Sequence, residues 1–280
     1  MAKLTFTTTG AWCGSADFGC ASLGLAGICD NLKNQSVTYP VALDGIVLTG
    51  TYDEILQSVT HVDCSVYAAI VVFGNAGGEN QFLKRLQQYI TCPMVGGGAA
   101  IDPLTGASAL ITDRGEAAVF LITDTAYTYT VQTKCIHDHV LGECDLELED
   151  ARTIRLINGI PAAQFLAENK KQFGLSEQDF EHLTLSDMQN VNAHLSCVDG
   201  VIKSGRDLDT RMILRRVEHA DVYHVIRDFY DDQNAIVFGC AGLSGLLDRP
   251  LDTHSLGLFL FGEVCTVGGV AEFGNLMLST

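Results

Sequence analysis

Four segments of the chain have apolar residues at helical spacing or carry helix start and stop signals. They are residues 52–62, 79–90, 162–173 and 221–230. The pattern is clearest at 79–90, where the apolar residues fall on one helical face and charged or amide side chains fall on the other. In 162–173, Pro161 suits the first turn and Gly174 follows the end. The sequence therefore predicts a helix at each segment.

Other segments are continuous runs of β-branched and aromatic residues, which is typical of strands buried on both faces. The predicted strands are 45–49, 68–74, 108–113 and 117–124 joined by a turn at Arg114 and Gly115, 131–142, 152–158 and 234–242. Residues 1–48, rich in Gly, Ala, Ser and Thr, favour further strands. The Gly-rich segment 93–100 is expected to be a loop, and the acidic run 143–150 a solvated face or loop.

The two halves of the chain contain similar segments. AIVVFGNAGG at 69–78 resembles AIVFGCAG at 235–242, and 94–112 resembles 260–279. Both pairs are offset by 166 residues, since position 69 corresponds to 235 and Gly96 to Gly262. A repeat of this kind predicts stacked like units. We therefore expect an α/β (α+β mixed) fold: two related units of mixed β-sheet with helices packed outside, at residues 1–130 and 131–280.

Composition and charge remove several classes of function. The chain is 47% hydrophobic with a mean hydropathy of +0.20, which argues against disorder. Its net charge of −17 and pI near 4.6 would repel nucleic acid and anionic lipid. No apolar run reaches the length of a membrane span or signal peptide, so we expect a cytoplasmic protein. Its ten scattered cysteines form no CxxC pair and indicate reduced thiols.

Several of these segments together resemble the FIST domain family. In the first half they are AAIVVFG, CPMVGGGAA and SALITDRGEAAVFLIT; in the second they are RTIRLINGIPA, AIVFGCAG and GLFLFGEVCTVGGVAEFGNLMLS. The resemblance covers residues 65–280 and divides the chain into a FIST N-like half (1–130) and a FIST C-like half (131–280). Residues 1–50 lack the helical opening of that family. The family's Arg after the Cys-x-Gly turn is also missing, since Leu243 follows Gly242 and the first arginine is Arg249.

The resemblance implies a sensory role. Members of the family act with signalling modules and are thought to bind small ligands such as amino acids, and some bacterial members bind haem. The resemblance thus implies a small-molecule ligand, a signalling partner such as a kinase or chemotaxis component, and haem as a possible cofactor. It does not imply an enzyme, a nucleic-acid partner or a membrane partner.

Six residues are candidate ligand contacts. Glu263 lies in an otherwise apolar run, where a carboxylate must be paired, protonated or facing a cavity. Asn275 can both donate and accept hydrogen bonds, and Cys240 ends a predicted buried strand. Glycines allow backbone N–H groups to approach a ligand closely; those expected here are Gly97, Gly98 and Gly262. The three side chains also have structural interpretations. The alternative for Glu263 is a carboxylate that accepts from backbone N–H groups, for Asn275 a turn residue, and for Cys240 a buried core thiol.

Two further hypotheses remain open. In KCIHDHVLGEC, period two would place Cys135, His137 and His139 on one strand face, and Cys144 could return to them as a metal or haem ligand. This spacing matches no standard metal motif, so a surface strand with exposed imidazoles is the better interpretation. A thiol enzyme would use Cys240 as nucleophile with a base brought by the fold, such as His224 or His254. Phosphate-loop spacing is absent, and we expect binding rather than turnover.

Overall fold

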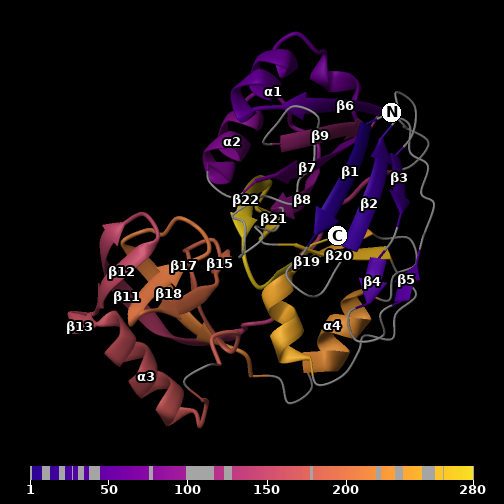
Figure 1. Ribbon diagram of the computed structural model, residues 1–280. Coiled ribbons are helices and arrows are strands. Elements are labelled where there is room, and N and C mark those ends of the chain that lie inside the picture. Colours follow the sequence, from indigo (N-terminus) through magenta and orange to yellow (C-terminus); the bar gives the residue numbers. More distant parts are fainter. Residues whose placement is uncertain are drawn as a thin grey trace.

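The computed structural model has helices and several mixed and antiparallel sheets, as expected for an α+β mixed fold (Figure 1). It describes residues 2–7, 13–18, 23–26, 28–30, 35–37, 45–75, 78–98, 117–122, 128–176, 179–218, 222–230, 236–247, 256–260 and 262–279. The predicted strand at 108–113, its turn at Arg114 and Gly115, and His254 lie outside these ranges. Within them, no helix combines the length and apolar character that crossing a membrane requires.

The first part of the chain forms short antiparallel strands, as its composition predicted. One sheet has the order β1-β2-β3, and a separate hairpin pairs β4 with β5. The bounds are β1 Ala2–Thr7, β2 Cys13–Phe18, β3 Leu23–Ala26, β4 Ile28–Asp30 and β5 Gln35–Val37.

A six-stranded mixed sheet follows, with the order β22-β21-β8-β7-β9-β6. Its central strands β7 and β8 run parallel, and the other pairs are antiparallel. Two of its strands come from the end of the chain, and Figure 1 shows them in yellow beside β8. The bounds are β6 Gly45–Gly50, β7 Ala69–Gly74, β8 Met94–Gly98, β9 Ala117–Ile122, β21 Glu263–Val267 and β22 Val270–Gly274.

Helices α1 (Tyr52–Val59) and α2 (Glu79–Leu86) pack on this sheet. Thr51 caps α1 in a reciprocal pair with Glu54, which satisfies backbone groups that a helix end leaves open. The apolar face predicted for α2 is buried through Phe82, Leu83 and Leu86. A short 3₁₀ helix, η1 (Cys64–Val66), leads into β7. The predicted helices at 52–62 and 79–90 are confirmed, although each ends a few residues early.

The predicted loop at 93–100 is wrong, because residues 94–98 form β8. Gly96 has φ of +129°, and a Cβ there would lie 1.9 Å from the carbonyl oxygen of Val72 on β7. Glycine therefore allows two parallel backbones to pair where a side chain would collide. Because glycines lack the β-branched and apolar side chains that predict strands, the sequence pattern does not indicate this strand.

The outer edge of this sheet is closed by side chains of α2. Gln87, next to the end of the helix, donates through Nε2 to the carbonyl of Ala271 and accepts from its N–H through Oε1, both at 2.7 Å. Asn80 accepts from the N–H of Phe273 at 2.9 Å. Asn80 and Gln87 thus supply hydrogen-bond partners for the backbone groups of Phe273 and Ala271 on the edge strand β22. These bonds protect the edge from pairing with another chain.

Replacing Gln87 with Ala is expected to lower the free energy of unfolding by about 1–2 kcal/mol, because two backbone groups of Ala271 lose their partners. Urea denaturation would measure this loss. Gln88→Ala is the matched control, because Gln88 is the exposed neighbour. Equal losses in the two variants would contradict the edge-closing role of Gln87.

The middle of the chain forms an antiparallel sheet with the order β15-β14-β18-β11-β12-β17-β16, and β13 pairs with β12. The bounds are β11 His139–Asp150, β12 Thr153–Ile157, β13 Ile160–Pro161, β14 Leu183–Ser186, β15 Asn192–Ala193, β16 Leu195–Val198, β17 Val201–Ser204 and β18 Arg211–Arg216. Helix α3 (Ala162–Gln172) packs against it and shares its core. The acidic run 143–150 lies in β11, where its acidic residues face solvent and alternate with buried Cys144 and Leu146. The prediction of a solvated face is confirmed.

A four-stranded mixed sheet completes the described structure, with the order β10-β23-β19-β20. Its bounds are β10 Thr133–Cys135, β19 Ile236–Cys240, β20 Leu256–Leu260 and β23 Met277–Ser279. Helix α4 (Val222–Tyr230) shares a core cluster with it, and a 3₁₀ helix, η2 (Ala241–Leu246), follows β19. The helices predicted at 162–173 and 221–230 are confirmed.

The segments predicted to repeat have comparable local structure. In the first, β7 pairs parallel with β8, the next described strand; in the second, β19 pairs parallel with β20. The matching residues Gly96 and Gly262 both have positive φ, at +129° and +91°. The division into domains at residues 1–130 and 131–280 stays a prediction. The six-stranded sheet contains strands from both of these parts of the chain.

Candidate functional site

The six predicted site residues lie close together in the interior. Glu263, at the start of β21, is opposite Gly97 of β8, and the N–H of Gly98 donates to the carbonyl of Gly262 at 2.8 Å. A Cβ on Gly97 would lie 2.3 Å from that same carbonyl oxygen. The absence of a side chain on Gly97 therefore lets segments more than 160 residues apart in the sequence meet backbone to backbone.

Glu263 is completely buried. Its Oε1 accepts a hydrogen bond from the N–H of Met277 at 2.5 Å, which ties β21 to β23. Its Oε2 is buried and has no hydrogen-bond partner among the described residues. Burial raises the pKa of this carboxyl well above its usual value, and the bond from Met277 only partly opposes the rise. Burial thus favours the acid form over the carboxylate, and in the acid form Oε2 can donate a hydrogen bond to an acceptor.

Cys240 ends β19 beside this acid and is also buried. Burial raises the pKa of its thiol to about 12, and the neighbouring Glu263 adds to the rise. Hydrogen bonds that the backbone N–H groups of Leu276, Gly242 and Gly262 donate to the sulfur act in the opposite direction. A thiol with this pKa stays protonated near neutral pH, so its environment suits a hydrogen-bond donor better than a nucleophile.

Asn275 lies in the turn between β22 and β23. Its backbone N–H donates to the carbonyl of Asn192 at 2.9 Å, and its Oδ1 accepts from the N–H of His194 at 3.3 Å. A Cβ on Gly262 would lie 3.0 Å from its Nδ2. The next residue, Leu276, has φ of +55°, which is strained for a branched side chain. Asn275 thus holds the turn where the chain passes from the six-stranded to the four-stranded sheet.

Three neighbouring polar residues were not predicted. A Cβ on Gly242 would lie 3.6 Å from Cys240 Sγ and 3.7 Å from His194 Cδ2, so the His194 ring lies near this thiol. Burial lowers the pKa of His194. Cys265, two residues after Glu263, donates to its carbonyl at 3.7 Å. Asn192 contacts Cys135, Ser186 and the carbonyl of Leu276. These side chains meet only through the fold, and the sequence around them carries no motif.

The hypothesis that Cys135, His137, His139 and Cys144 share one strand face is wrong, because β10 ends at Cys135 and β11 begins only at His139. The favoured interpretation, a surface strand with exposed imidazoles, is also wrong at His137, which is buried. His139 is half-buried and its Nδ1 lies 2.9 Å from a carboxylate oxygen of Glu218, while Cys144 belongs to the core of the middle sheet. Among the described residues, no three His, Cys, Asp or Glu side chains are arranged to hold a metal ion. These four residues do not fit a shared metal or haem ligand set.

His137 is fully buried and both of its ring nitrogens are used. Nε2 lies 2.7 Å from the carbonyl of Glu181, and Nδ1 lies 3.4 Å from the amide of Asn192. The carbonyl accepts, so Nε2 carries the proton in the neutral ring. Burial lowers the pKa of His137 to about 4. It is therefore a neutral structural residue near pH 7 rather than an available metal ligand.

The chain matches no family model, and comparisons with curated proteins and with solved structures find no match either. The resemblance to the FIST domain family therefore stays a prediction. Chemically, the site gathers three groups that can donate near one sheet junction: Glu263 in its acid form, the Cys240 thiol and the Asn275 amide. Such a set suits a ligand that presents hydrogen-bond acceptors, such as a carboxylate or carbonyl.

Proposed function

We propose that the protein is a sensory domain of the FIST type that binds a small ligand, such as an amino acid or similar metabolite, at the Glu263 junction. The supporting observation is the fully buried Oε2 of Glu263, which has no partner among the described residues. A buried polar atom without a partner costs about 1–3 kcal/mol. A ligand oxygen that accepts from this group would recover much of that cost.

The location of the junction suggests how binding could be relayed. Glu263 joins β21 of the six-stranded sheet to β23 of the four-stranded sheet through Met277. A ligand that binds one arrangement of these sheets better than another shifts the population toward it. We propose that a signalling partner, such as a kinase or chemotaxis component, reads this shift.

A thermal-shift screen of amino acids and other small metabolites tests the proposal. A ligand present at 100 times its Kd stabilises the folded state by about 2.7 kcal/mol, which corresponds to a rise in Tm of several degrees. In Glu263→Ala, which removes the side-chain donor, ligand affinity is expected to fall at least tenfold. The rise should be retained in Glu149→Ala, which removes an exposed carboxylate from β11. If no compound raises Tm, or if Glu263→Ala responds like the unaltered protein, the proposal fails.

A further inference from the structure

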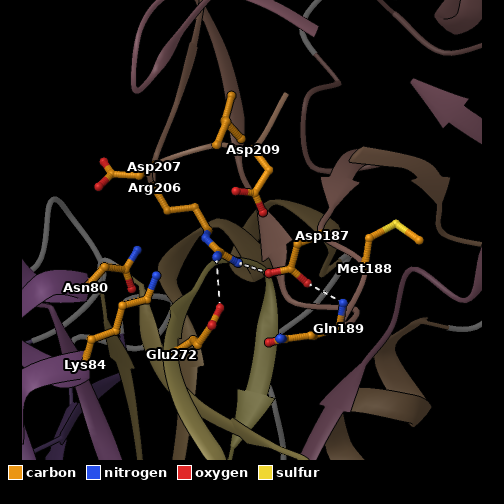
Figure 2. A pocket seen from close by; sticks show the side chains of 10 residues that line it. Asn80, Lys84, Asp187, Met188, Gln189, Arg206, Asp207, Asp209 and Glu272 are labelled. Carbon is orange, nitrogen blue, oxygen red and sulfur yellow. Dashed lines mark hydrogen bonds and ion pairs between the residues drawn. The ribbon is translucent and has the colours of Figure 1, made fainter. Parts of the chain in front are cut away.

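A separate polar pocket lies where three distant parts of the chain meet (Figure 2). Lys84 comes from α2, Asp187 from the turn after β14, Arg206, Asp207 and Asp209 from the segment after β17, and Glu272 from β22. Its volume is about 160 Å³. Cavities of about 150 Å³ hold a molecule the size of benzene, so there is room for roughly six non-hydrogen atoms.

Arg206 forms the floor of this pocket. Its side chain is only 8% exposed, with Nη1 3.1 Å from Asp187 and Nη2 3.2 Å from Glu272. Figure 2 shows both contacts converging on the one guanidinium group, and the backbone N–H of Gln189 holding the other oxygen of Asp187 at 2.9 Å. Two carboxylates against one cation leave the floor with a formal charge of −1.

The rim does not cancel the negative charge of the floor. Lys84 and Asp209 are exposed, form no ion pair with another described residue and carry opposite formal charges. Asp207 is paired with Arg152 at 2.7 Å, outside the lining residues. The four carboxylates and two cationic side chains of the lining give a formal charge of −2, or −1 when Arg152 is counted as the partner of Asp207. This negative charge favours a cationic ligand over a neutral, zwitterionic or anionic one.

The floor also offers one donor. Nε of Arg206 is buried and has no hydrogen-bond partner among the described residues, although both of its Nη atoms are paired. Guanidinium nitrogens only donate, so this N–H requires an oxygen acceptor. An oxygen on a ligand in the pocket would supply one.

We propose that this pocket binds a small amine of net positive charge that also carries a hydroxyl or carbonyl oxygen, as in an amino alcohol. The ammonium group is held by the exposed carboxylate of Asp209 and the negative floor, and the ligand oxygen accepts from Arg206. The pocket does not include Glu263, so this inference stands apart from the proposed function.

Isothermal titration with four matched three-carbon compounds tests the chemistry. 3-Amino-1-propanol is expected to bind best. 1-Propylamine lacks the oxygen and should bind several-fold more weakly, because one hydrogen bond is lost. β-Alanine adds a negative charge to a negative pocket and should bind about tenfold more weakly, and propionate should not bind at millimolar concentration. No binding of 3-amino-1-propanol, equal binding of 1-propylamine, or tighter binding of β-alanine would overturn the proposal.

Two surface variants give an independent test, because both positions are exposed and neither should disturb folding. Asp209→Asn is expected to weaken 3-amino-1-propanol about tenfold, while Lys84→Gln should strengthen it several-fold by removing a like charge. Glu149→Gln, on β11, controls for loss of a carboxylate outside the pocket. Weaker binding in Lys84→Gln, or unchanged binding in Asp209→Asn, would contradict a cationic ligand.

Discussion

Replacing Arg206 with Met is expected to lower the free energy of unfolding by about 3–5 kcal/mol, because it leaves two carboxylates close together without their shared cation. Asp187 and Glu272 are only 8% and 12% exposed, so water compensates them poorly. Nη1 of Arg206 also donates to the carbonyl of Val191 at 3.1 Å. Equilibrium urea denaturation would measure the loss.

Arg211 offers a matched control, because the side chains of its ion pair with Glu143 are both exposed to solvent. Arg211→Met should change stability little, since exposed ion pairs contribute little. The triple change Arg206→Met, Asp187→Asn and Glu272→Gln should recover at least half of the loss, because no buried charge remains. Equal losses for Arg206→Met and Arg211→Met would mean that the buried network does not stabilise the fold.

Glu263→Gln is expected to become progressively more stable than the unaltered protein as pH rises. The folded-state pKa of Glu263 is raised above the ordinary value of 4.5. Above that value the unfolded chain releases the proton while the folded chain keeps it, so folded Glu263 binds more protons and stability falls with pH. The fall continues until the folded-state pKa is passed.

Each pH unit in this window corresponds to about 1.4 kcal/mol for one group. The stability difference between Glu263→Gln and the unaltered protein should therefore grow with pH from about pH 5, by at most this amount per pH unit, until the folded-state pKa is reached. Urea denaturation at several pH values measures it. Parallel stability curves for the two proteins would show that Glu263 is already ionised in the fold.

His137 produces the opposite slope over an overlapping range. Its pKa is lowered from 6.5 to about 4, so between these values the unfolded chain holds the proton and the folded chain does not. Stability from His137 therefore rises with pH in this window. The two buried groups have opposite slopes above about pH 4.5 in the unaltered protein, and Glu263→Gln should leave the rising slope, to which His194 with its lowered pKa also contributes.

The sequence predicted the helices and most strands because their apolar spacing is a local property. It missed β8 because a strand of Met94, Val95 and three glycines lacks the side chains by which strands are recognised. It singled out Glu263, which the structure buries, because an acid in an apolar run is unusual. It did not find Arg206, Asp187 and Glu272, since each lies in an ordinary polar context and becomes buried only when separate strands meet.

The edge of β8 has a consequence for biosynthesis. Its partner β21 begins at Glu263, about 140 residues after β9 ends at Ile122. At a synthesis rate of about 5–20 residues per second, the ribosome needs roughly 7 to 28 seconds to make that stretch. Throughout this interval the nascent chain presents the open side of β8, to which a neighbouring polypeptide could add. Dependence on a chaperone during translation, and aggregation of products truncated before residue 263, are the expected results.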